Sequence, residues 1–135
     1  MLNRELASIL SEMTGFRVDY YGDTFIDFNV YIPYIEKRAT LTVHTEKNQI
    51  SASITYGYLD PSMRVYGLMN ELTRSSFSKF YINSSGKLAG FAEYNGFDYS
   101  NTEIEFFARE LKLLLGNIPD EELTSIYKNL ISMCN

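Results

Sequence analysis

Three segments, residues 24–32, 39–45 and 49–58, alternate apolar and polar side chains with a period of two, and this alternation constrains the fold more than any other feature of the chain. In residues 24 to 32, one side of the predicted strand is aliphatic, whereas Phe25 and Tyr31 lie on the other side. Strands with this pattern have one buried face and one face that is open to water or to a partner. Turn residues at 22–23 and 47–48 connect consecutive strands, which predicts an antiparallel sheet.

The remaining periodicity predicts an α+β domain over residues 1–135, with a mainly antiparallel sheet, helices packed on it and the order α-ββββ-α-ββ-αα. Asp60 followed by Pro61 predicts an N-cap and the start of the second helix, and Ser100 and Asp120 predict the caps of the last two helices. The predicted helices span about residues 2–13, 60–74, 100–115 and 120–131, and the predicted strands span about residues 16–21, 24–32, 39–45, 49–58, 77–83 and 87–97.

The apolar positions of these elements predict the hydrophobic core. We also place Tyr58 on the buried side of its strand and expect a bulge or a close approach at Gly90. The predicted core includes Leu6, Ile9, Ile26, Phe28, Val30, Leu41, Val43, Ile54, Leu68, Leu72, Phe107, Leu111 and Ile126.

The charge of the chain disfavours two classes of partner. The net charge is −5, from 12 basic and 17 acidic residues without a basic run. Nucleic acid and anionic membranes attract basic surfaces, so we expect neither as the main partner. The start of the chain lacks the apolar run of a signal peptide, and no stretch has the length of a membrane span. With a single cysteine, these features predict a cytoplasmic protein.

The residues that carry most enzyme chemistry are scarce. The chain has one histidine, His44, and the only acid predicted beside it is Glu46, which is fewer ligands than a metal site uses. Cys134 lies at the end of the last helix without an evident base. Asp19 and Asp27 flank the first hairpin turn, where a solvated face explains them. We therefore predict a protein that is not an enzyme and that holds no metal or cofactor.

Aromatic side chains on the polar side of the sheet indicate a recognition surface. Phe25 and Tyr31 lie opposite the aliphatic stripe of their strand, and Tyr20 extends the same side. Clustered exposed aromatic residues are typical of binding sites. We predict that Phe25, Tyr31 and Tyr20 bind a partner. The alternative is that the first helix or the last two helices cover this side.

Part of the chain resembles the YbjN-like family of small bacterial proteins. The resemblance rests on the helix VYGLMNELTR at residues 65–74, the strand FSKFYI at residues 77–82, and the amphipathic helix from Glu103 to Leu115. The broader group shares its fold with type III secretion chaperones, which are small, acidic and cytosolic and bind an extended segment of a partner. The resemblance therefore implies a chaperone-like fold and a protein or peptide partner.

Two functions follow as expectations. The first is a non-catalytic cytosolic protein-binding module of chaperone-like or regulatory type. The alternative is an acidic inhibitor or immunity-type protein that masks a basic toxin or nucleic-acid enzyme. The resemblance also implies a homodimer whose two-fold interface contains Val65, Tyr66, Met69 and Phe80. The competing interpretation is that these side chains complete the core of a single chain.

Overall fold

The computed structural model describes residues 1–75, 78–117 and 119–135. Within these residues the chain forms four helices and six strands in the predicted order, and all strands join one antiparallel sheet. The α+β class is therefore confirmed. The elements are α1 (Asn3–Thr14), β1 (Arg17–Tyr21), β2 (Phe25–Ile32), β3 (Lys37–Glu46), β4 (Gln49–Tyr58), α2 (Met63–Ser75), β5 (Lys79–Ile82), β6 (Lys87–Asn95), α3 (Asn101–Leu114) and α4 (Glu121–Ile131).

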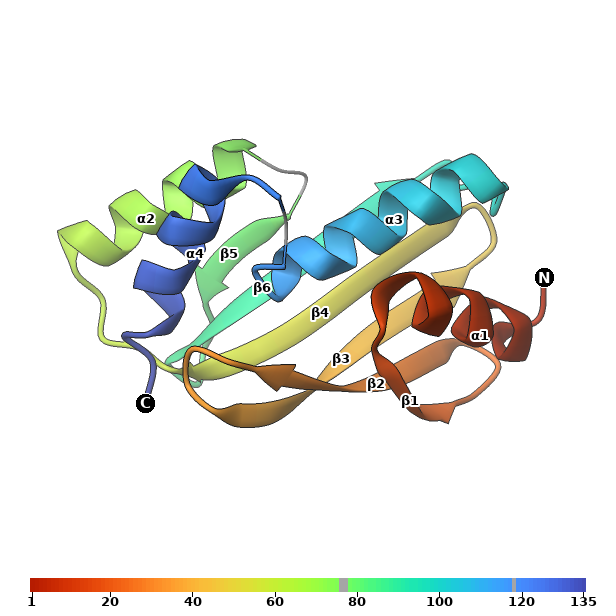
Figure 1. Ribbon diagram of the computed structural model, residues 1–135, viewed down its shortest axis with the longest axis horizontal. Helices are drawn as coiled ribbons and strands as arrows, with labels where there is room; N and C mark the ends of the chain where they lie inside the picture. The colour runs from red at the N-terminus through yellow and green to blue at the C-terminus, as the bar shows by residue number, and fades with distance from the viewer. Residues whose placement is uncertain (76–77, 118) are drawn as a thin grey trace.

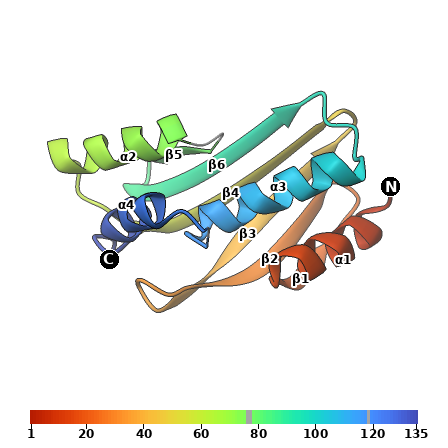
Figure 2. The same cartoon turned by 45° about the horizontal axis from the view of Figure 1, so that its top comes forward.

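The sheet has the strand order β1-β2-β3-β4-β6-β5, with every neighbouring pair antiparallel. Figure 1 shows the helices lying across one side of the sheet, with α1 over the β1–β2 end and α4 beside α2 at the other end. The turned view keeps the helices on that same side (Figure 2). In this two-layer arrangement, none of the described helices covers the second side of the sheet.

The side of the sheet under the helices holds the core. The rows that cross it include Ile26–Val43–Ala52–Ala92, and each of these side chains has an exposed fraction of 0%. Most of the predicted core is buried as expected. Ile9, Leu68 and Ile126 are instead only partly buried at the margin of the same cluster, because each lies toward the edge of its helical stripe.

The prediction that Tyr58 lies on the buried side of its strand is wrong. The pairing of β4 with β6 shifts between Thr55 and Gly57, which inserts one residue into β4. A bulge of this kind reverses the side on which the following residues point. Tyr58 is consequently 56% exposed and pairs with Lys87, whereas Tyr56 stays in the core.

Two of the three predicted helix caps are confirmed. Leu123 donates its backbone N–H to Asp120 Oδ1 at 3.0 Å, and Glu103 donates to Ser100 Oγ at 3.3 Å. Asp60 is not the cap of α2. Val65 donates its backbone N–H to Ser62 Oγ at 3.1 Å, so Ser62 takes that role and the helix begins at Met63.

The C-terminal end of α3 is fixed by two tyrosines from other elements. Tyr56 of β4 and Tyr127 of α4 each donate a hydroxyl hydrogen bond of 2.6 Å to the backbone carbonyl of Leu114. The carbonyls of a last helical turn need such partners when they are buried. Gly90 of β6 makes room for this junction, because a Cβ there would lie 2.7 Å from the Tyr56 hydroxyl oxygen. The close approach predicted at Gly90 is confirmed.

The strand expected from residue 77 begins at Lys79, and Phe77 itself lies outside the described residues. The same holds for residue 118 in the connector between the last two helices.

Candidate functional site

The side of the sheet without helices, called here the helix-free face, can be traced residue by residue through the strand register. One row crosses the whole sheet and ends at Lys79 of β5. In order it contains Tyr20, Asp27, Thr42, Ser53, Phe91 and Lys79. Hydroxyl side chains occupy the middle of the face, and aromatic side chains lie toward both ends.

The predicted binding residues lie on this helix-free face. Tyr20 is 67% exposed and Tyr31 is 50% exposed, while Phe25 is partly buried. The alternative that helices cover these residues is wrong, because the helices occupy the opposite side (Figures 1 and 2). Their role in binding stays a prediction.

The structure brings only two of the three residues together. The rings of Tyr20 and Phe25 stack with centroids 6.1 Å apart. Tyr31 is six residues beyond Phe25 in β2, which separates them by about 20 Å along the strand. Tyr31 instead pairs across the sheet with Arg38, whose guanidinium donates to Asn29 Oδ1 at 2.8 Å.

A second aromatic group lies at the other end of the helix-free face. We call it the β5–β6 patch and define it as Tyr58, Lys79, Tyr81, Lys87 and Phe91, which surround Ala89. Ala89 is only 5% exposed although no helix lies above it, which means that the neighbouring side chains cover it. Ala89 is therefore the buried apolar centre of the β5–β6 patch.

Sequence reasoning missed the β5–β6 patch for two reasons. First, the bulge in β4 turns Tyr58 to the helix-free face, and regular alternation does not predict this. Second, the pairing of β6 with β4 brings together residues more than 20 positions apart, such as Tyr58 and Lys87, and periodicity within one strand cannot show this. The available signal was the alternation of Lys79 and Tyr81 with apolar residues, which places both on the exposed side of the short strand β5.

Both edges of the sheet are poorly suited to adding another strand. The β1 edge is interrupted by a bulge between Val18 and Tyr20, and Asp19 lies within it. The β5 edge is only four residues long and carries the exposed Lys79. Bulges, short strands and lysine are features that oppose edge pairing. A partner is therefore better accommodated on the helix-free face than at an edge.

The residues considered for catalysis do not converge. His44 lies on the helix-free face between Phe25 and Ser51, and Glu46, at the end of the same strand, lines a hollow with Asn3 and Asp23. Asp27 accepts a hydrogen bond of 2.7 Å from the hydroxyl of Thr42. Among the described residues, no three His, Cys, Asp or Glu side chains form a group able to hold a metal ion.

Cys134 is packed into the core rather than at a frayed chain end. The backbone of Asn135 exchanges hydrogen bonds of 2.9 and 3.2 Å with Tyr58, which holds this segment against β4. Burial raises the pKa of the Cys134 thiol to about 11, with Lys37 acting weakly in the opposite direction. The thiol is therefore protonated at neutral pH, the state in which cysteine is a poor nucleophile.

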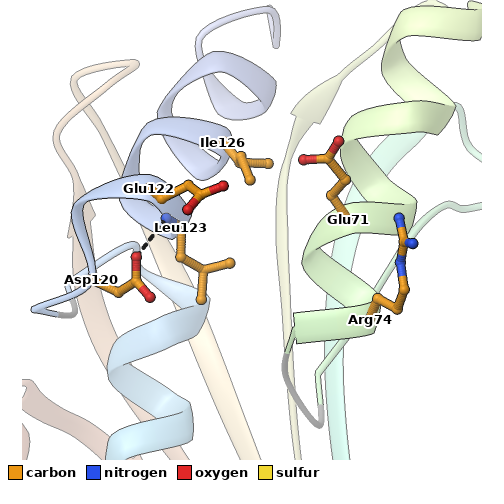
Figure 3. Close-up of a pocket in the computed structure, with 6 residues that line it drawn as sticks. All are labelled: Glu71, Arg74, Asp120, Glu122, Leu123 and Ile126. Atoms are coloured by element: carbon orange, nitrogen blue, oxygen red, sulfur yellow. Dashed lines mark hydrogen bonds between the residues drawn. The ribbon is translucent and has the colours of Figure 1, made fainter.

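A pocket of about 470 Å³ opens between α2 and α4. Figure 3 shows Glu71 and Arg74 of α2 on one side, and Glu122 with the cap residue Asp120 on the other. The side chains of Leu123 and Ile126 supply its apolar part. Three carboxylates and one guanidinium give this pocket an acidic character that the helix-free face lacks.

The residues predicted for a two-fold interface lie mostly inside the chain. Val65, Met69 and Phe80 are 3%, 4% and 6% exposed. Phe80 stacks on Tyr56 with ring centroids 6.3 Å apart. The intramolecular interpretation explains these three residues, and Tyr66, at 49% exposed, is the one available on the surface. Self-association stays a prediction.

None of the helices in the described part of the chain combines the length and the apolarity needed to cross a membrane.

Comparison with known proteins finds similarity at the level of structure. No protein-family model matches the chain, and no curated protein matches it. The chain is similar to a chain of the heterodimeric ExoU-SpcU complex from the type III secretion system of Pseudomonas aeruginosa, with 15% sequence identity and a TM-score of 0.47. The similarity covers 88% of this chain and 94% of that chain. The YbjN-like resemblance stays a prediction, because no family model supports it.

Proposed function

We propose that this protein is a non-catalytic binding module, of chaperone-like or regulatory type and cytoplasmic, whose helix-free face docks another protein or a peptide segment. The single observation that carries the proposal is the one-sided arrangement of the helices, which leaves aromatic side chains exposed on a regular sheet (Figure 2). Aromatic residues are enriched at protein interfaces, because their large rings add apolar contact area.

The size of the face fits this function. Strands about 4.8 Å apart, with up to ten residues rising about 3.3 Å each, span an area of roughly 750 Å² once the shorter edge strands are included. A standard protein interface buries about 800 Å² per partner. The helix-free face is therefore large enough for one such interface.

The test is capture of a partner from native lysate with three forms of the protein. The wild type and a Tyr66→Ser control, which alters an exposed tyrosine on α2, are expected to retain the same partner. A Phe25→Ser, Tyr81→Ser, Phe91→Ser variant is expected to lose it while its circular dichroism spectrum stays unchanged. Retention of the partner by the triple variant would contradict binding at the helix-free face.

A second candidate function has its own observation. Glu71, Asp120 and Glu122 converge on one pocket between α2 and α4 (Figure 3), which supports an inhibitor or immunity-type role toward a basic partner. In the same capture experiment, a Glu71→Lys, Glu122→Lys variant would then lose the partner, and the triple variant of the helix-free face would keep it.

A further inference from the structure

We propose that the β5–β6 patch binds an acidic partner segment that carries aromatic side chains; this inference rests on the proposed function and names the chemistry of its partner. The feature behind it is the pairing of aromatic and basic residues across the strands. Phe91 lies opposite Lys79, and Tyr58 lies opposite Lys87. The Nζ atom of Lys87 is 5.0 Å from the centroid of the Tyr58 ring.

The pattern extends beyond the β5–β6 patch. Tyr31 of β2 also lies opposite a basic residue, Arg38 of β3, on the same face. Each pair presents an apolar ring and a cation side by side. An ionised carboxylate contacts the cation through a charge-assisted hydrogen bond, and an adjacent aromatic ring of the partner contacts the aromatic side chain.

The charge of the face differs from that of the rest of the chain. Among the described residues, the helix-free face carries the four basic side chains Arg17, Arg38, Lys79 and Lys87. It also carries the acidic side chains Asp27, Glu46 and Glu93, and Asp19 lies in the bulge at its edge. Since the whole chain has 12 basic and 17 acidic residues, the face is neutral and the net negative charge lies on the remainder. Within the face, the β5–β6 patch carries Lys79 and Lys87 and no carboxylate, so an acidic partner is attracted to this patch and repelled elsewhere.

The geometry of the β5–β6 patch suits an extended segment. Its three rows are Phe91–Lys79, Ala89–Tyr81 and Lys87–Tyr58. Alternate residues of a strand are about 6.6 Å apart, so the three rows follow one another at the spacing of alternate side chains in an extended peptide. The buried Ala89 marks the middle row, where Tyr81 is 47% exposed and available for contact.

The test uses random copolymers of defined composition, with binding followed by fluorescence anisotropy of the labelled polymer. The probe is a glutamate–tyrosine copolymer, and the comparison probes are a lysine–tyrosine copolymer, polyglutamate and single-stranded polythymidine. We expect the glutamate–tyrosine copolymer to bind most tightly. A Lys79→Glu, Lys87→Glu variant should weaken its binding about tenfold, as the loss of central contacts at an interface does.

The matched control is Arg64→Glu, Lys128→Glu, which changes the net charge equally at two exposed positions on α2 and α4. It should change the binding less than twofold, and both variants should unfold at the wild-type temperature. Equal weakening by the control, equal binding of polythymidine, or failure of the glutamate–tyrosine copolymer to bind would overturn the inference. Tighter binding of the lysine–tyrosine copolymer would also overturn the inference. If a Tyr81→Ser, Phe91→Ser variant then lost that binding, the proposed function of the helix-free face would still stand.

Discussion

Phe28 and Tyr31 lie three residues apart in β2, and they illustrate how differently the two faces of the sheet are used. Phe28 points toward the helices and is 0% exposed, and its ring forms a T-shaped pair with that of Phe16, with centroids 6.3 Å apart. Tyr31 points to the helix-free face and is 50% exposed. The covered face determines the fold through packing, whereas the helix-free face can change its chemistry with little effect on folding. A binding surface can therefore occupy the second face without disturbing the first.

Truncation of these two β2 residues is the strongest test of the difference between the two faces. Phe28→Ala should lower the free energy of unfolding by about 3–5 kcal/mol, because it leaves a cavity in the core. Tyr31→Ala should change it by less than about 1 kcal/mol, because surface substitutions rarely do more. Urea denaturation of both variants measures the difference. Similar losses would show that the helix-free face is also part of the stabilising core.

A smaller effect is expected at the junction between α3, β4 and α4. Tyr56→Phe and Tyr127→Phe should each cost about 1 kcal/mol, since each removes one of the two hydroxyl donors to the Leu114 carbonyl. The double variant should cost more than the sum of the two, because the buried carbonyl then loses both donors, at about 1–3 kcal/mol. Denaturant titrations of all three proteins form a double-mutant cycle. Strict additivity would mean that water replaces the tyrosines.

The sequence predicted the fold well where local pattern and packing agree. Strict alternation in β2 and β3 placed Ile26, Phe28 and Val43 correctly in the core, because one buried face imposes a period of two. Ser100 and Asp120 were recognised as caps since the cap and its N–H donor are only three residues apart. Features that depend on residues only a few positions apart can therefore be predicted from the sequence.

The β5–β6 patch was not predictable by the same reasoning. Tyr58 points to the helix-free face because of a bulge beside Gly57, which the regular alternation of β4 outweighed in the prediction, and Phe91 contacts Lys79 only through strand pairing. The cap of α2 was misassigned to Asp60 for a related reason, since Ser62 competes with it two residues later. In each case the outcome depends on which of several locally acceptable options the tertiary structure favours.

The smallest effect concerns a carboxyl group on the helix side of the molecule. Glu110 of α3 is half-buried, and its carboxylate accepts a hydrogen bond of 3.3 Å from Ser78. Burial raises the pKa of Glu110 above its ordinary value of 4.5, while Ser78 and the nearby Arg109 oppose that shift. By contrast, Glu93 is exposed on the helix-free face.

A raised pKa means that the folded chain binds the proton of Glu110 more tightly than the unfolded chain does. The resulting stabilisation is complete below the ordinary pKa and is lost as the pH rises through the folded value. Glu110→Gln should therefore gain stability relative to the wild type as the pH rises from about 4 to 7, since a neutral amide has no ionised form to desolvate. Glu93→Gln, which removes the same charge on the helix-free face, should follow the wild-type profile. Urea denaturation at a series of pH values measures both, and parallel profiles for the two variants would show that burial does not raise the pKa of Glu110.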